Sequence, residues 1–182
     1  MANPKTVLII MGSVREGRRC PAIAAWTMTR RPPSIHCEIV DLREWPLPMD
    51  DEPAVPATGK YANDHTRAWS ARVAAADGFV IVTPQYNWGY PAALKNALDH
   101  LYDEWKGKPV LLVTYGGHGG DKCARQLRTV AKGLHLKAMR TSPALILSRA
   151  QILGAPFDAE SDLERHLRKL TRAWKQLERA LR

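Results

Sequence analysis

The chain has 182 residues, of which 45% are hydrophobic and 25% charged, and its formal net charge is +9. This length suits one domain covering residues 1–182, and the composition excludes a disordered or fibrous protein. No stretch approaches the roughly 20 apolar residues that a membrane-spanning helix needs, and the first residues lack the pattern of a signal peptide. We therefore expect a cytoplasmic protein with no membrane partner.

The first elements along the chain are a strand, a helix and a second strand. Lys5–Met11 is a continuous apolar run, which predicts a strand buried on both faces. Pro21 suits the first turn of a helix that continues through residues 22–29. Ile35–Leu42 alternates apolar and polar residues, which predicts a less buried edge strand. The Pro-rich segment Arg43–Lys60 then predicts a long loop, either functional or passive.

The middle of the chain repeats the same alternation. Helical spacing of apolar residues predicts helices within Tyr61–Ala76 and Ala92–Tyr102. Phe79–Thr83 and Val110–Tyr115 are unbroken apolar runs of strand length. We expect both strands to be buried on both faces, as in a parallel sheet covered by helices.

Two helices and a weaker strand complete the chain. Asp121 suits the start of a helix, and a fifth strand is expected within Lys137–Leu147, weakened in its middle by Pro143. The last helix carries an apolar stripe that predicts packing on the sheet, or less favourably a dimer seam: Leu163, Leu167, Leu170, Trp174, Leu177 and Leu181. Its basic residues predict a solvated face: Arg165, Arg168, Lys169, Arg172, Lys175 and Arg179.

Strict alternation of strands and helices predicts an α/β fold with a parallel sheet. Five strands are too few for a TIM barrel. With right-handed crossovers, a flavodoxin-like three-layer sandwich with strand order 2-1-3-4-5 is the common arrangement. Ligands of such sheets bind beyond the carboxyl ends of the strands where the order reverses, so the loops after strands one, three and four are the ones to inspect.

The loop after the first strand combines glycines, a hydroxyl and arginines just before a helix. It reads Gly12-Ser13-Val14-Arg15-Glu16-Gly17-Arg18-Arg19-Cys20. Backbone N–H groups at a helix start attract anions, and arginines offer forked donors suited to phosphate. The loop matches neither the GxGxxG fingerprint nor the GxxxxGK(S/T) P-loop. It predicts a phosphate site of another kind, with a plain basic turn as the alternative.

The other two loops are rich in aromatic residues and in glycine. Thr83-Pro84-Gln85-Tyr86-Asn87-Trp88-Gly89-Tyr90-Pro91 offers flat rings beside amide groups, as a planar heteroaromatic ligand requires. Tyr115-Gly116-Gly117-His118-Gly119-Gly120 lets the backbone approach a ligand closely. A histidine in such a loop is more often exposed and idle than catalytic. The six histidines show no metal-ligand spacing and the three cysteines form no CxxC pair, so we expect no metal site.

Together these loops resemble those of the NAD(P)H-dependent FMN reductase family, which includes quinone, azo and chromate reductases. Three elements carry the resemblance: Pro84-Gln85-Tyr86-Asn87 followed by Pro91 and Leu94-Lys95-Asn96-Ala97-Leu98-Asp99, the opening Gly12-Ser13-x-Arg15, and the turn Tyr115-Gly116-Gly117. The resemblance implies an FMN-containing oxidoreductase that passes a hydride from NADPH or NADH to an acceptor. That acceptor would be a small molecule such as a quinone, an azo dye, free flavin or a metal oxyanion.

The resemblance also implies roles for individual residues. The FMN phosphate would be held by Ser13, Arg15 and Arg18, with Cys20 as a neighbouring backbone contact. The ring would be lined on one side by Pro84, Gln85, Tyr86 and Asn87, and closed on the other by Tyr115, Gly116 and Gly117. Some relatives have a small hydroxyl residue where this chain has Arg18 and Arg19. No side chain is required as a catalytic base, and relatives are usually homodimers or dimers of dimers.

Two other functions are weighed against this one. A flavodoxin-type electron carrier without enzymatic activity would share the fold, but such carriers are typically acidic and hold phosphate with a Ser/Thr-rich loop. A nucleic-acid-binding module is suggested by charge alone and lacks any recognisable motif, so we expect no nucleic-acid partner. The abundance of arginine mildly favours NADPH over NADH.

Overall fold

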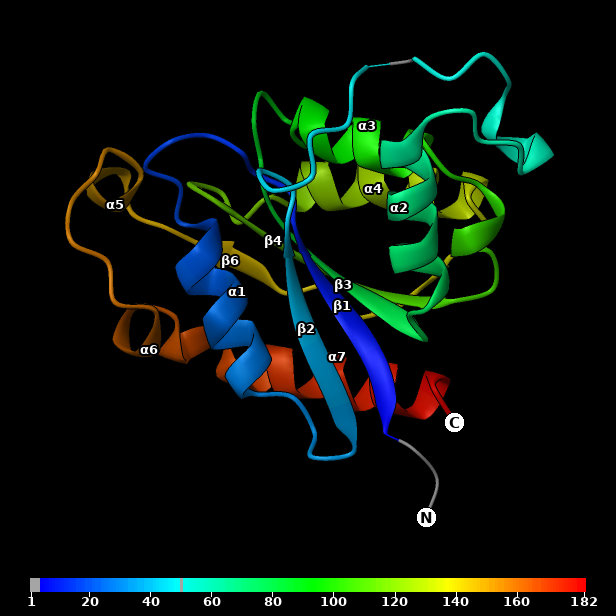
Figure 1. Ribbon diagram of the computed structural model, residues 1–182. Coiled ribbons are helices and arrows are strands. Elements are labelled where there is room, and N and C mark those ends of the chain that lie inside the picture. Colours follow the sequence, from blue (N-terminus) through cyan, green and yellow to red (C-terminus); the bar gives the residue numbers. More distant parts are fainter. Residues whose placement is uncertain (1–3, 50) are drawn as a thin grey trace.

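The computed structural model describes residues 4–49 and 51–182 and contains one parallel sheet (Figure 1). The strand order is β2-β1-β3-β4-β5, and β6 also pairs with β4. This confirms the predicted flavodoxin-like order, with β2 at the edge that its alternating sequence indicated. The strands are β1 (Lys5–Met11), β2 (Ile35–Asp41), β3 (Gly78–Pro84), β4 (Pro109–Gly116), β5 (Lys137–Ala138) and β6 (Ala144–Ile146).

The predicted fifth strand is divided into two short strands, β5 and β6, which pair with opposite ends of β4. Pro143 has no N–H to donate, and its carbonyl accepts a hydrogen bond of 3.0 Å from the Thr114 N–H. Just before it, the Thr141 N–H is bonded to the Gln176 side chain at 2.9 Å instead of to β4. The chain therefore leaves the sheet between the two strands and rejoins it after Pro143.

Helices cover both faces of the sheet (Figure 1). The helices are α1 (Cys20–Thr29), α2 (Asp64–Ala74), α3 (Ala92–Asp99), α4 (Asp121–Gly133), α5 (Arg149–Ile152), α6 (Ala159–Asp162) and α7 (Leu167–Ala180). Short 3-10 turns lie at Pro56–Thr58, Asp103–Trp105 and Glu164–His166. The last long helix thus begins at Leu167, later than the apolar stripe predicted, and Leu167 itself is exposed.

The core divides into two layers because side chains alternate along each strand. Val7 and Ile9 of β1 pack with α1 and α7, whereas Leu8 and Ile10 pack with α2, α3 and α4. Large aromatic residues fill both layers, and their ring N–H groups are satisfied. The indoles of Trp69, Trp105 and Trp174 donate to the backbone oxygens of Ala97, Leu98 and Thr27 at 2.8, 3.1 and 3.1 Å, respectively.

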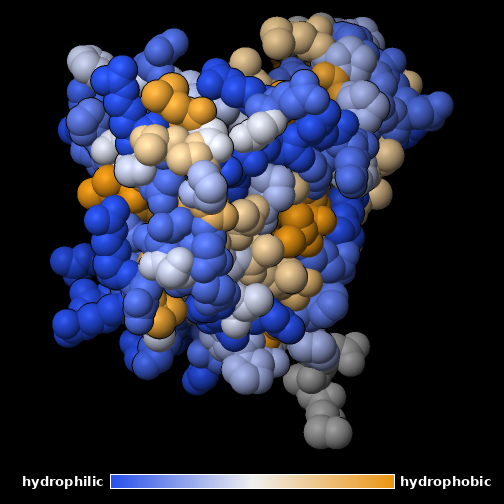
Figure 2. Space-filling view, turned by 90° about the vertical axis from the view of Figure 1, so that its left-hand side faces the viewer, coloured by the Kyte–Doolittle hydropathy of each residue, from blue (hydrophilic) through white to orange (hydrophobic). Residues whose placement is uncertain are grey.

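The surface is predominantly hydrophilic on the side that carries α1, α5 and α6, with hydrophobic areas interspersed (Figure 2). The basic residues of the C-terminal segment are exposed, which confirms the predicted solvated face. Its apolar stripe, apart from Leu167, packs on the sheet. Within residues 4–49 and 51–182, no helix has both the length and the apolarity to cross a bilayer. All three cysteines are free.

The outer edge of β6 is covered by side chains that follow α6. The Arg165 guanidinium donates to the Ile146 carbonyl at 2.7 Å, and the Ile146 N–H donates to Nε2 of His166 at 3.3 Å. Burial and the neighbouring Arg165 lower the pKa of His166, which keeps its imidazole neutral and able to accept this bond.

Candidate functional site

The three predicted loops meet at the carboxyl ends of β1, β3 and β4 and enclose a cavity of about 180 Å³. The predicted site residues that line it are Arg15, Arg18, Pro84, Gln85, Tyr86, Tyr115, Gly116 and Gly117. Ser13 and Cys20 are fully buried beside the loop and do not line the cavity, and Asn87 is exposed outside it.

Arg18 is a buried cation with unused donors. Its side chain is 8% exposed, and its Nη2 forms an ion pair with the Asp41 carboxylate at the end of β2. Nε and Nη1 are buried and have no hydrogen-bond partner within the described part of the chain. Unsatisfied buried donors are costly, and those of a charged group most of all. Because Arg18 also lines the cavity, its free donors suit a bound phosphate.

Ser13 and Arg15 connect the first loop to the second. The Ser13 hydroxyl lies 2.9 Å from the Tyr86 hydroxyl, so the two share a hydrogen bond. The Arg15 guanidinium stacks over the Tyr86 ring, 4.1 Å from its centroid. The aromatic loop is therefore anchored to the arginine-rich loop through one residue, Tyr86.

Two weakly acidic groups buried beside the cavity, the Cys20 thiol and the Tyr115 phenol, are held neutral. Cys20 begins α1, and its thiol donates to the Val82 carbonyl at 3.3 Å. Burial raises the pKa of Cys20 to about 11. Burial likewise raises the pKa of Tyr115 far above its usual value. At neutral pH neither the thiol nor the phenol is available as a base or an anionic nucleophile.

Gln85 is engaged in structural hydrogen bonds. Its side-chain Oε1 accepts from the Cys123 N–H at the start of α4 at 3.1 Å, and its own N–H donates to the Tyr115 carbonyl at 2.9 Å. Pro84 and Gln85 thus tie β3 to both β4 and α4.

A tight turn forms the tip of the aromatic loop. Tyr86 and Gly89 exchange backbone hydrogen bonds of 2.9 and 2.8 Å. Asn87 and Trp88 between them have φ values of 47° and 70°, as a turn with two left-handed central residues requires. Trp88 is 62% exposed, and the Lys122 ammonium lies 3.1 Å from its ring centroid. The indole is therefore presented to solvent on a rigid turn.

The glycine-rich turn requires glycine where α4 begins. Gly120 has a φ of 82°, and a Cβ there would lie 2.8 Å from the Cβ of Thr114. The Gly116 carbonyl accepts from the N–H groups of Gly119 and Leu147 at 3.0 and 3.1 Å, which joins the turn to β6. His118 is exposed, consistent with the idle role expected for it.

Four further residues line the cavity: Gly17 and Arg19 of the arginine-rich loop, and Leu147 and Ile152, which the sequence did not indicate. Arg19 does not offer free donors to phosphate as its loop suggested. Its guanidinium donates to the Gln151 carbonyl at 2.9 and 3.1 Å and to that of Ala155. Arg19 thereby holds the segment around α5 against the cavity. Leu147 and Ile152 follow the divided fifth strand, and no local motif marks them.

This doubly wound parallel sheet, with a pocket suited to a phosphorylated ligand at its switch point, defines a flavodoxin-like protein. The model of the NADPH-dependent FMN reductase family matches residues 5–150, and the chain belongs to that family. It is an NAD(P)H- and FMN-dependent oxidoreductase, so the electron-carrier alternative is set aside.

Relatives of known name agree with this membership. The chain is 52% identical over 176 residues to an NAD(P)H-dependent FMN reductase of Schizosaccharomyces pombe, covering 94% of this chain and 88% of the relative. It is 30% identical to a quinone reductase of Escherichia coli K12, and the match covers 89% of this chain and 84% of that relative. The chain also resembles the solved structure of FerB, a flavoenzyme NAD(P)H:acceptor oxidoreductase from Paracoccus denitrificans, with a TM-score of 0.73 and 20% sequence identity. The match covers 97% of this chain and 98% of FerB, which supports the fold.

Proposed function

We propose that FMN binds in the cavity at the ends of β1, β3 and β4, with its phosphate on the arginine-rich loop. The observation that carries this proposal is the pair of buried, unpartnered donors on Arg18. Asp41 fixes Nη2 of Arg18 and so orients the remaining donors. Arg15, the Ser13 loop and the start of α1 at Cys20 would complete the phosphate site.

The ring of FMN would lie between the aromatic loop and the glycine turn. Pro84, Gln85 and Tyr86 would supply one wall, with Asn87 at its solvent-exposed end, and Tyr115, Gly116 and Gly117 would supply the other. The Gln85 side chain is already bonded to α4, so this segment would contact the ring mainly through its backbone. The glycines leave the opposite side free of bulky side chains.

When bound, FMN supplies the hydride chemistry that joins NAD(P)H to the acceptor. The residues of the chain would bind and orient the two rings and exclude water. We infer that no side chain acts as nucleophile or general base, because Cys20 and Tyr115 are buried with raised pKa values. Residues 1–182 would then form a single FMN-binding domain.

We propose a planar aromatic acceptor of the quinone type. The support is a set of exposed apolar side chains in the segments that form the cavity. Ile152 lines the cavity and is 51% exposed, Leu153 next to it in the chain is 74% exposed, and Trp88, in the turn after Tyr86, is 62% exposed. Flat rings stack on such side chains, whereas a hydrated metal oxyanion gains little from them. The E. coli relative named quinone reductase supports the same class of acceptor, and azo dyes and free flavin share its planarity.

An anaerobic absorbance titration of the FMN-loaded protein tests the proposal. NADPH should bleach the oxidised flavin band, and one equivalent of benzoquinone should restore it. Trp88→Ala should lower kcat/KM for benzoquinone several-fold and leave that for chromate unchanged. Val55→Ala serves as a matched control, since Val55 is 68% exposed and does not line this cavity. An equal loss of kcat/KM for benzoquinone and chromate in Trp88→Ala, or a wild-type enzyme that reduces chromate faster than benzoquinone, would refute the quinone assignment.

We extend the proposal to a cytoplasmic homodimer, or a dimer of dimers. An open groove of about 450 Å³ between the Pro-rich segment and α3, lined by Trp45, Leu47, Met49 and Ala93 among others, offers an apolar surface for a second copy. Light scattering coupled to gel filtration measures the mass directly. A monomer at micromolar concentration would remove this part of the proposal without affecting the flavin site.

A further inference from the structure

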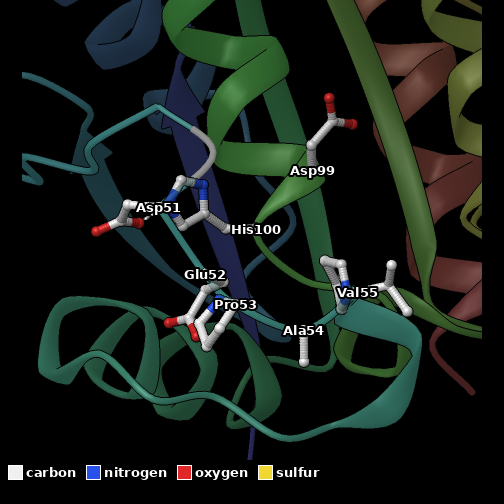
Figure 3. Close-up of a pocket in the computed structure, with 8 residues that line it drawn as sticks. Asp51, Glu52, Pro53, Ala54, Val55, Asp99 and His100 are labelled. Atoms are coloured by element: carbon white, nitrogen blue, oxygen red, sulfur yellow. Dashed lines mark ion pairs between the residues drawn. The ribbon is translucent and has the colours of Figure 1, made fainter.

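Three potential metal ligands from three separate elements converge away from the flavin cavity. Asp51 lies in the Pro-rich segment, His65 in the first turn of α2, and His100 directly after α3. Carboxylate oxygens of Asp51 lie 3.0 Å from Nε2 of His65 and 3.7 Å from Nε2 of His100. Figure 3 shows the Asp51 carboxylate directed at the His100 ring. One ligand atom from each residue lies within 4.8 Å of the other two.

His100 is held in the orientation of a metal ligand. Its side chain is 3% exposed, and its Nδ1 lies 2.9 Å from the Asn96 carbonyl. A carbonyl only accepts, so Nδ1 carries a proton, and in the neutral ring Nε2 presents a lone pair to the cluster. Nε2 is buried and has no hydrogen-bond partner in the described part of the chain. A histidine that donates one ring N–H to a backbone carbonyl and points the other nitrogen at a metal is the usual arrangement in metal sites.

The cavity beside the cluster favours a cation. It has a volume of about 230 Å³ and is lined by Asp51, Glu52, Asp99 and His100, together with backbone and side chains of residues 53–56 (Figure 3). The Glu52 carboxylate is fixed by the N–H groups of Ala62 and Asn63 at 2.8 and 3.1 Å. The Asp99 carboxylate is paired with Lys95. The Asp51 carboxylate is therefore the acidic group that faces His100, beside a space large enough for an ion and a water molecule.

We propose that Asp51, His65 and His100 bind one divalent transition-metal ion, with zinc as the best match. Two imidazoles and one carboxylate, with a fourth position left to water, form a common zinc donor set. Bonds of about 2.0–2.2 Å in a tetrahedral site place ligand atoms about 3.3 Å apart. Oδ1 of Asp51 lies 3.1 Å from Nε2 of His65 and 3.7 Å from Nε2 of His100, on either side of that value. The ligand atoms all lie within 4.8 Å of one another, and small rotations of the half-buried His65 ring close the site.

A metal bound here clamps the Pro-rich segment to α2 and α3. Without it, this part of the segment is held by side-chain hydrogen bonds such as those of Glu52. The sequence predicted no metal site, because its histidines show no metal-ligand spacing; only the fold brings Asp51, His65 and His100 together. The site lies outside the flavin cavity, so it does not depend on the function proposed above.

Zinc titration of the chelator-treated, FMN-loaded protein by calorimetry tests the proposal. We expect one zinc ion per chain, and a loss of at least tenfold in affinity in both Asp51→Asn and His65→Ala. His36→Ala is the matched control, because His36 is an exposed histidine 3.4 Å from a carboxylate of Glu38, with no third ligand among residues 4–49 and 51–182. It should bind zinc like the wild type. Equal zinc affinity in His65→Ala and His36→Ala, or no binding by the wild type, would overturn the proposal.

Hydrogen exchange supplies a second measurement that does not involve activity. Zinc should slow exchange of the backbone amides of residues 51–58 in the wild type and in His36→Ala, and leave it unchanged in His65→Ala. His65 is partly exposed, so its replacement leaves the fold intact, whereas replacement of the buried His100 risks misfolding. Zinc protection that persists in His65→Ala would show that the ion binds elsewhere.

Discussion

Replacement of Arg18 by methionine should weaken FMN binding by roughly two orders of magnitude. Methionine keeps much of the buried volume and removes both free donors, Nε and Nη1. A hydrogen bond to a charged group contributes about 1.5–3 kcal/mol. Two such bonds at the lower limit contribute about 3 kcal/mol, which corresponds to roughly a 150-fold rise in Kd. The side chain is 8% exposed, so solvent screening reduces this figure little.

Fluorescence titration of the apoprotein measures Kd for FMN and for riboflavin, which lacks the phosphate. The wild type should prefer FMN strongly, and Arg18→Met should lose most of that preference with riboflavin affinity nearly unchanged. Asp41→Asn is the control, since it keeps the guanidinium and removes the carboxylate that orients it, and it should cause a smaller loss. Folding is checked by thermal unfolding. A folded Arg18→Met protein that still prefers FMN as strongly as the wild type would refute the phosphate assignment.

Three further predictions concern stability. Tyr86→Phe removes the partner of the buried Ser13 hydroxyl and should lower the free energy of unfolding in urea by about 1–3 kcal/mol; no change would show that another group satisfies Ser13. Gly120→Ala should lower the free energy of unfolding by more than about 1 kcal/mol, because Gly120 has a φ of 82° and an added Cβ would crowd Thr114. At Gly133 an added Cβ would have open space around it, so Gly133→Ala should be neutral or stabilising. Similar thermal midpoints for the two variants would contradict this. Burial raises the pKa of Asp77, but hydrogen bonds from Lys5 and Thr6 outweigh this effect and lower the pKa below its ordinary 3.8. The ionised carboxylate therefore contributes its full stability above pH 3.8 and loses it as pH falls through the lowered pKa. The difference in free energy of unfolding between wild type and Asp77→Asn should shrink from pH 7 to pH 3, and a constant difference would count against this reasoning.

The fold was largely predictable because hydrophobic patterning reports burial directly. The alternation in Ile35–Leu42 identified the edge strand, and unbroken runs identified the central ones. The errors lie where tertiary contacts override local pattern. Pro143 divides the last strand instead of merely weakening it. Leu167 matches the helical stripe but is exposed, because the chain turns through a 3-10 segment just before it.

The flavin site was predictable in its residue types and less so in its contacts. Contiguous loops carry the arginines and aromatics, so a single sequence reveals them. The hydrogen bond between Ser13 and Tyr86 joins residues 73 positions apart, and Arg19 reaches across 132 positions to Gln151. Such pairings depend on strand order and helix placement, and no local spacing encodes them. The same holds for the cluster of Asp51, His65 and His100, which only the packed fold assembles.

The side chains over β6 bear on how the protein behaves in concentrated solution. A bare strand edge invites another chain to add a strand and begin aggregation. Here the outward-facing N–H and C=O of Ile146 are already bonded to His166 and Arg165, so an incoming strand meets no free pairing groups at that residue. The protection requires an imidazole that accepts a hydrogen bond. Acidification through the lowered pKa of His166 protonates that nitrogen. The Ile146 N–H then becomes free to pair with an incoming strand, while its carbonyl stays bonded to Arg165.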